Sequence, residues 1–209
     1  MPTLDRRADA RDKALQDLQD SGVLMMDGHF DYGNGYHGRA YLNAHHLFRH
    51  PSTIWRFAQD LIDVLPPDLV QQTQVVAGPV TGGALLAHTI AGLLDSKRSL
   101  THPACSFAPF TYDRSGVLAL RAFYADEVRG KRVLLADDVR NTGETFSRCA
   151  ALLREAGAIV LATVEIYDRL EAVSGPGVPN IALAGYKAPP NYKAADCPLC
   201  KAGTPITRF

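Results

Sequence analysis

Two adjacent carboxylates, Asp137 and Asp138, come directly after the apolar run 133–136 and before a loop, 139–145, that holds two threonines and a glycine. Ionised carboxylates at the end of a buried strand are costly unless a cation or hydroxyl groups satisfy them. The loop offers backbone N–H groups, hydroxyls and the positive end of the helix predicted after it, which together bind anions. This combination favours a ligand that carries both ribose hydroxyls and a phosphate. The alternative is a plain strand-to-helix turn whose acids are solvated or cap the helix.

Regular elements must hold these residues in place. The run 133–136 is short and continuous, which is typical of a strand buried in a parallel sheet. After the loop, apolar residues at helical spacing, from Phe146 to Ala156, predict a helix that Gly157 ends. The unit is therefore a strand, a ligand loop and a helix.

The spelling Val-Leu-Leu-Ala-Asp-Asp-Val-x-x-Thr-Gly-x-Thr over residues 133–145 resembles the phosphoribosyl-pyrophosphate (PRPP) motif of the type I phosphoribosyltransferases. The resemblance implies that Asp137 and Asp138 act in catalysis by holding the ribose hydroxyls, close to a Mg²⁺ ion that arrives with PRPP. It also implies that the following residues bind the 5′-phosphate: Val139, Arg140, Asn141, Thr142, Gly143, Glu144 and Thr145. A threonine is usual at position 141, so we expect weakened rather than lost phosphate binding.

A second strand, loop and helix unit spans residues 74–88. Its glycine pair, Gly82 and Gly83, lets backbone N–H groups approach an anion at the start of the helix. Together with Thr81, the pair resembles the pyrophosphate-binding loop of the family. The spelling Val-Ala-Gly-Pro-x-x-Gly-Gly is similar to the orotate branch in particular.

The N-terminal part contains an amphipathic helix pattern over residues 5–20 and short apolar pieces over 23–43 that predict an antiparallel hairpin. The hairpin resembles the hood segment of orotate phosphoribosyltransferases, which would set Tyr41 against the base. Asn34 and Gly38 stand where that segment has serines. The alternative is an insertion unrelated to function.

Residues 51–65 predict a core helix that Pro66 and Pro67 end. Three histidines precede it, at positions 45, 46 and 50. Since no cysteine or carboxylate stands nearby at ligand spacing, we do not interpret them as a metal site.

Residues 105–110 predict another strand, and 111–129 resembles the mobile loop that closes over the active site in this family, often reaching the partner subunit of a dimer. A catalytic lysine normally follows that strand, but here Phe110 takes its place. The cations of the loop that could replace it are Arg114 and Arg121. Arg121 matches the family's loop arginine better, so it is our candidate catalytic cation.

A strand predicted over residues 160–167 ends in Asp168 and Arg169. In the orotate branch, the arginine at this place faces the carboxylate of the base, which a guanidinium binds through two hydrogen bonds. The alternative is a surface salt bridge. Residues 181–185 predict an edge strand.

The four cysteines do not form a disulfide framework, since Cys105 and Cys149 fall inside predicted core elements. Cys197 and Cys200 supply two of the four ligands that a zinc site needs, and neither core cysteine is placed to complete the set. We interpret them as part of a packed tail. Zinc shared across a dimer is the alternative.

The 209 residues can form one domain with an appendage, and we divide them into a helix and hood hairpin (1–50), a phosphoribosyltransferase core (51–185) and a tail (186–209). The 22 basic and 22 acidic residues balance, which gives no reason to expect nucleic acid or a membrane as partner. There is no apolar run of membrane-spanning length and no secretory signal pattern. We therefore expect a cytoplasmic protein.

The resulting prediction is an α/β fold: a mainly parallel five-stranded sheet with flanking helices, plus a small hood from the N-terminal hairpin and the C-terminal tail. The resemblance implies a homodimeric, Mg²⁺-dependent enzyme that transfers the ribose 5-phosphate of PRPP to orotate and releases pyrophosphate. Two alternatives stay open. One is transfer to another base, and the other is a PRPP-sensing protein that has lost the chemistry.

Overall fold

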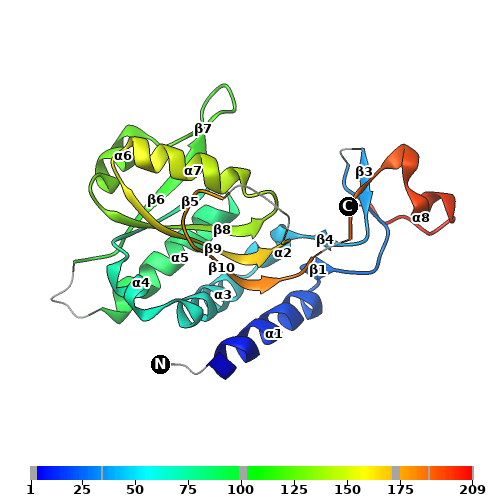
Figure 1. Ribbon diagram of the computed structural model, residues 1–209, viewed down its shortest axis with the longest axis horizontal. Coiled ribbons are helices and arrows are strands. Elements are labelled where there is room, and N and C mark those ends of the chain that lie inside the picture. The colour runs from blue at the N-terminus through cyan, green and yellow to red at the C-terminus, as the bar shows by residue number, and fades with distance from the viewer. Residues whose placement is uncertain (1–3, 34, 99–102, 171–174, 188, 209) are drawn as a thin grey trace.

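A computed structural model of the chain describes residues 4–33, 35–98, 103–170, 175–187 and 189–208 (Figure 1). Its helices are α1 (Leu4–Asp20), α2 (Ala44–Phe48), α3 (Pro51–Val64), α4 (Pro67–Gln72), α5 (Gly82–Lys97), α6 (Ala122–Val128), α7 (Glu144–Glu155) and α8 (Pro198–Lys201), with a 3₁₀ turn, η1 (Ala194–Asp196). Its strands are β1 (Leu24–Met25), β2 (Phe30–Asp31), β3 (Tyr36–Gly38), β4 (Tyr41–Leu42), β5 (Val75–Pro79), β6 (Ser106–Tyr112), β7 (Leu118–Ala119), β8 (Arg132–Arg140), β9 (Ile159–Asp168), β10 (Asn180–Gly185) and β11 (Tyr192–Lys193).

The main sheet has the strand order β10-β9-β8-β5-β6-β7. The first five of these strands are mutually parallel, and the prediction of a mainly parallel five-stranded sheet is therefore confirmed. The two-residue strand β7 adds an antiparallel edge to β6. Residues 111–129 were expected to form a loop, but this stretch contains the end of β6, β7 and helix α6. The expectation missed them because these elements are short.

Helices cover both faces of this sheet, with α1, α3 and α5 on one side and α6 and α7 on the other (Figure 1). Side chains of β8 alternate between the two cores: Leu134 and Ala136 pack toward α3 and α5, whereas Val133 and Leu135 pack toward α6 and α7. Burial on both faces explains why this strand has a continuous apolar sequence. The carboxyl end of β8 is thus supported by packing on both faces of the strand.

The predicted hood is also present, and it joins the N-terminal hairpin to the C-terminal tail. Strands β1 and β4 pair with each other, and β2, β3 and β11 form a second small sheet in the order β11-β3-β2. The tail closes further onto the hairpin, since the N–H of Thr207 donates to the carbonyl of His29 at 2.8 Å. In Figure 1, β3 and α8 lie beside each other in a lobe set apart from the main sheet. The division of the chain at residues 51 and 186 stays a prediction.

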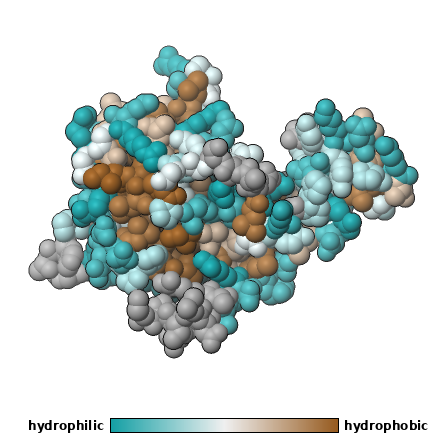
Figure 2. Space-filling model, viewed as in Figure 1, coloured by the Kyte–Doolittle hydropathy of each residue, from teal (hydrophilic) through white to brown (hydrophobic). Residues whose placement is uncertain are grey.

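The hood lobe, which we define as residues 27–41 and 189–208, differs in character from the main body. Both hydrophobic core clusters of the described chain lie outside it. On the face drawn in Figure 2, hydrophobic residues gather over the main body, whereas the lobe is mostly hydrophilic. The described part of the chain contains no helix that is long and apolar enough to cross a membrane.

Candidate functional site

The two predicted acids lie at the carboxyl end of β8, the third strand of the main sheet. The strand continues to Arg140, so the acids belong to the strand rather than to the loop after it. Asp137 is 8% exposed, and its Oδ1 accepts the N–H of Asp138 at 2.9 Å. Asp138 Oδ1 accepts the N–H of Val139 at 2.9 Å. Their backbone hydrogen bonds fix both carboxylates at the sheet edge where open α/β sheets bind ligands.

The start of helix α5 lies directly against these acids. A Cβ atom added to Gly82 would lie 2.3 Å from Asp138 Oδ2, and one added to Gly83 would lie 2.6 Å from Asp137 Oδ1. Side chains at these two positions would therefore displace the acids. The Val80–Thr81 peptide bond in the preceding turn is cis. The glycine pair thus allows close approach of the acid pair. Its predicted role, binding of an anion by backbone N–H groups, stays a prediction.

Three cavities surround the acid pair. The first, the loop cavity, measures about 180 Å³ and lies at the start of α7. Gly143, the residue just before that helix, has a φ of 77°, a left-handed conformation that glycine adopts easily. The cavity is lined by Asp137, Val139, Arg140, Asn141, Thr142, Gly143, Glu144, Thr145, Phe146 and Arg148. All seven predicted phosphate-binding residues therefore line one anion-sized space. Arg148 was not predicted, but it lies one helical turn after Glu144 and pairs with it.

The second space, the helix cavity, measures about 290 Å³ and lies between the start of α5 and both acids. It is lined by Phe48, Pro79, Val80, Thr81, Gly82, Tyr112, Asp137, Asp138 and Thr145. Thr81 and Gly82 lie where the resemblance expected them. Tyr112, the last residue of β6, was not predicted.

The third space, the hood cavity, is the largest, at about 410 Å³, and it lies between the acids and the hood. The two predicted base-binding residues, Arg169 and Tyr41, both line it, together with Leu24, Tyr32, Ala40, Leu42, Asp138, Val139, Asn141, Tyr167 and Asn191. The rings of Tyr32 and Tyr41 stack with centroids 6.1 Å apart. An aromatic wall facing a guanidinium suits a flat ligand that carries a negative charge.

The hood also explains one departure from the family spelling. A Cβ atom at Gly38 would lie 2.0 Å from the hydroxyl oxygen of Tyr32, which donates to the carbonyl of Ala40 at 2.6 Å and to Asn191 Oδ1 at 3.1 Å. The residue must therefore be small. Asn34, the other departure, lies outside the described residues.

Burial is the main cause of the shifted pKa values of the acidic residues near the end of β8. Burial raises the pKa of Asp137 well above its usual range, and the neighbouring charge of Asp138 raises it further. Glu165 lies beside Asp137 on β9, and burial raises its pKa to about 7. A bound cation or hydroxyl donor would lower the cost of ionising Asp137.

The predicted pair Asp168 and Arg169 has divided roles. Asp168 Oδ2 lies 2.7 Å from Arg140 Nη1 and forms a largely buried ion pair. Arg169 Nη1 lies 3.5 Å from Asn141 Oδ1, at the wall of the hood cavity. Arg140 is thus anchored by the strand end, and Arg169 is the cation that lines the hood cavity.

Apart from Tyr112, the described residues of the closing segment (111–129) do not line these cavities. Phe110 is fully buried and packs in the core on the α6 and α7 side. Arg121 is exposed at the start of α6, and it is absent from the described lining of the three cavities. Arg114 lies in the turn between β6 and β7, also exposed. The catalytic role assigned to Arg121 therefore stays a prediction.

Comparison with known proteins decides the family. The chain is 32% identical to the orotate phosphoribosyltransferase of Thermotoga maritima over 192 residues, which is 91% of this chain and 94% of that protein. It is 31% identical to the enzyme of the same name from Acidithiobacillus ferrooxidans over 198 residues, or 93% and 94% of the two chains. The chain belongs to the orotate phosphoribosyltransferase family. A scan against models of protein families found no match.

Solved structures agree on the fold of this family member. The crystal structure of orotate phosphoribosyltransferase from Aeropyrum pernix superposes with a TM-score of 0.62 at 23% identity, covering 82% of this chain and 93% of that one. An adenine phosphoribosyltransferase from Thermoanaerobacter pseudethanolicus gives 0.59 at 16% identity, covering 82% and 99%. At these identities the likeness supports the type I phosphoribosyltransferase fold and nothing finer.

Proposed function

We propose that the protein catalyses transfer of the ribose 5-phosphate of PRPP to orotate, with release of pyrophosphate. The observation that carries the proposal is the meeting of three cavities at one acid pair. Asp138 lines the hood cavity, Asp137 lines the loop cavity, and both acids line the helix cavity. A sugar held on these acids has three different spaces available to the groups it carries.

Each part of the substrates has a matching space. The 5′-phosphate would occupy the loop cavity, where backbone N–H groups at the start of α7 and two threonines offer donors. Pyrophosphate would occupy the helix cavity, against Thr81 and Gly82 at the start of α5. In the reaction the bond from C1′ to pyrophosphate oxygen breaks, and a bond from C1′ to the ring nitrogen of orotate forms.

The acceptor would occupy the hood cavity. Orotate is a flat ring that carries a carboxylate, so Arg169 would bind the carboxylate and Tyr41 would pack against the ring. Positioning the two reactants in adjacent cavities accounts for most of the catalysis expected of such a site.

A Mg²⁺ ion would enter this site with PRPP. The donors fit a hard cation, since Asp137 and Asp138 present carboxylate oxygens, and Gly82 and Gly83 beside them have no side chains to crowd these oxygens. When bound, the ion would neutralise charge on pyrophosphate. The residues of the chain hold the ribose and orient C1′ toward the hood cavity.

A cation for the departing pyrophosphate has to come from elsewhere. Phe110 is uncharged and buried, so it cannot supply the positive charge of the usual lysine. We propose that Arg121 supplies this charge when its segment closes, in a cytoplasmic homodimer as the family resemblance implies. Removing one donor of charge at a developing anion typically costs about 3–4 kcal/mol.

The test is pyrophosphate release from Mg-PRPP in the presence of a panel of bases. We expect release with orotate, lost in Arg121→Ala. Arg169→Ala should raise the KM for orotate roughly 30-fold, from loss of a charge-assisted contact of about 2 kcal/mol, with PRPP affinity unchanged. Release with another base only would move the function to a sister transferase. PRPP binding without release for any base would identify a sensor and refute the proposal.

A further inference from the structure

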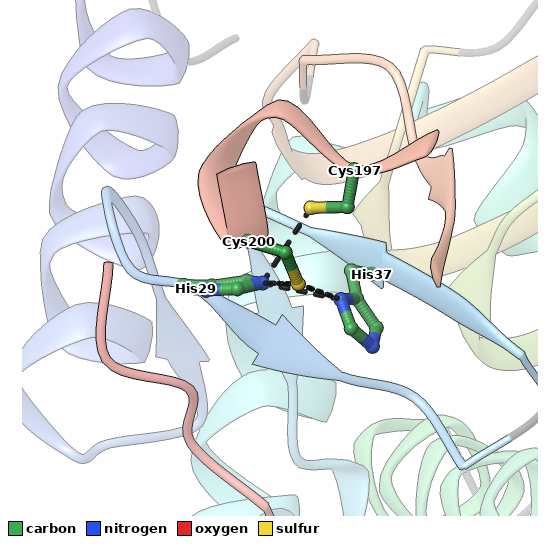
Figure 3. A group of neighbouring side chains, drawn as sticks. All are labelled: His29, His37, Cys197 and Cys200. Atoms are coloured by element: carbon green, nitrogen blue, oxygen red, sulfur yellow. Dashed lines mark hydrogen bonds between the residues drawn. The ribbon is translucent and has the colours of Figure 1, made fainter. Parts of the chain in front are cut away.

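Four metal-ligating side chains meet in the hood lobe, away from the acid pair. His29 and His37 come from the N-terminal hairpin, and Cys197 and Cys200 come from the tail (Figure 3). One ligand atom from each lies within 4.8 Å of the other three. Cys200 is exposed, and the other three are buried. Sequence reasoning counted only the two cysteines, because the histidines lie at least 160 residues away along the chain.

Four of the six separations between ligand atoms are close to those of tetrahedral coordination. A tetrahedral zinc ion with Zn–N bonds of about 2.0 Å and Zn–S bonds of about 2.3 Å holds two nitrogens about 3.3 Å apart, and a nitrogen and a sulfur about 3.5 Å apart. Here His29 Nε2 and His37 Nδ1 are 3.2 Å apart. Sulfur to nitrogen separations are 3.5 Å (Cys197 to His29), 3.6 Å (Cys200 to His29) and 3.3 Å (Cys200 to His37).

The outer nitrogen of His29 is hydrogen-bonded, and that of His37 lies near a carboxylate. His29 Nδ1 lies 2.9 Å from the carbonyl oxygen of Thr204, so Nδ1 carries the proton and Nε2 presents a lone pair inward. His37 Nε2 lies 3.9 Å from Asp31 Oδ1. Metal-bound histidines usually have such carbonyl or carboxylate partners. A hydrogen-bonded cluster of imidazoles and thiols without metal does not require this arrangement.

We propose that this cluster is a structural zinc site of the Cys₂His₂ type. Thiolate and imidazole ligands select zinc over the hard cations magnesium and calcium. Two thiolates balance the charge of Zn²⁺, so the complex is neutral, as burial requires. All four positions are filled by the protein, which is typical of structural rather than catalytic zinc.

The ion would fasten the tail to the hairpin where no apolar core does so. Both core clusters lie outside the hood lobe, and small lobes of this kind commonly depend on a metal. The lobe carries Tyr32 and Asn191, which line the hood cavity. Resting on the proposed function, we expect loss of zinc to raise the KM for orotate several-fold while PRPP affinity stays constant.

Metal content of the full-length protein is the first test. After purification under reducing conditions without chelator, elemental analysis should find about one zinc per chain. Cys200→Ser and His37→Gln should lose it, whereas Cys105→Ser, a buried cysteine outside the cluster, should keep it. Because Cys200 is exposed, its serine variant is expected to fold, which circular dichroism checks.

Cobalt substitution and hydrogen exchange test the same site in the wild-type sequence. Co²⁺ added after chelation should give the visible absorption of a tetrahedral ion with a thiolate charge-transfer band. Chelation should reduce amide protection in residues 29–40 and 192–207 and leave β8 unchanged. Absence of both bound zinc and the Co²⁺ spectrum, or a Cys197–Cys200 disulfide in the protein as isolated, would overturn the proposal. None of these measurements uses turnover, so their failure is separate from failure of the proposed function.

Discussion

Polar groups are held in place differently at the carboxyl end of β8, which we call the sheet edge, and in the hood lobe. Asp137 and Asp138 stand at the end of a strand whose two faces pack into separate apolar cores. The hood lobe surrounds its histidines and cysteines with three short strands, and both apolar cores lie elsewhere. Apolar packing around β8 therefore positions the acids. In the hood lobe, the proposed zinc ligands instead hold the hairpin and the tail together. Substitutions at the sheet edge should lower the rate of the reaction, and substitutions in the hood lobe should raise the KM for the acceptor.

Removing a charge at the sheet edge is expected to have the largest effect. Asp137→Asn and Asp138→Asn should each lower kcat/KM with PRPP by about 1000-fold, since each loses charge-assisted hydrogen bonds worth about 4 kcal/mol together. Steady-state kinetics measures this loss, calorimetric titration measures the affinity for PRPP, and thermal unfolding checks that the variants fold. Unchanged PRPP affinity in both variants would remove the acids from the site, and zinc content should stay constant in either case.

Crowding the same edge should be the next most damaging change. In Gly82→Ala the new methyl group would displace Asp138, and a shift of about 1 Å in such a site costs on the order of 100-fold in rate. Gly92→Ala in the same helix is the matched control, because nothing lies within 4 Å of its added Cβ atom. That control should be slightly stabilising. Equal activity of both variants would show that close approach at Gly82 is unimportant.

Crowding the hood should have a smaller and more selective effect. In Gly38→Ala the methyl group would meet the end of a flexible side chain, Tyr32, which can move at the cost of its hydrogen bond to Asn191. Loss of about 1.4 kcal/mol would raise the KM for the acceptor roughly 10-fold and leave the Kd for PRPP unchanged. Steady-state kinetics in each substrate decides the matter, with Lys193→Ala as an exposed hood control. A parallel loss in PRPP affinity would contradict the division between edge and hood.

The smallest effect on activity is expected at Glu165, beneath the acids. Its pKa is about 7 in the folded protein, against 4.5 ordinarily. The folded state thus binds this proton more tightly than the unfolded state, so its contribution to stability is complete below pH 4.5 and declines until about pH 7. Glu165→Gln, which keeps an oxygen for the amide of Asn180, should raise the free energy of unfolding by roughly 1–3 kcal/mol near pH 8.

Urea denaturation near pH 5 and near pH 8 measures this contribution. The gain should shrink at the lower pH, where Glu165 is already protonated. Glu155→Gln, an exposed change on α7, should show no such pH dependence. An equal gain at both values would mean that Glu165 is not protonated in the folded state.

The difference between the two regions also explains what the sequence could reveal. The acids, their loop and the start of α5 come from contiguous stretches, so patterns along the sequence predicted the parallel strands and the ligand loops. The candidate roles of Thr81 and Arg169 came from the family resemblance of their motifs. The hood site is made by residues that only the folded chain brings together, and a Cys-x-x-Cys alone left its partners undetermined. Tyr32 and Asn191 were missed for the same reason. Short elements such as β7 and α6 were missed because a few residues carry no periodicity.

The pairing of the hairpin with the tail has a consequence for how the protein is made. The five parallel strands are complete at Gly185, whereas His29 must wait for Cys197, which is synthesised 168 residues later. At about 5–20 residues per second, the ribosome needs roughly 10–30 s to supply it. We therefore expect nascent chains to assemble the parallel sheet with its acid pair first and to fasten the hood last. Hydrogen-exchange labelling of arrested chains can follow that order, and early protection of the hairpin would reverse it.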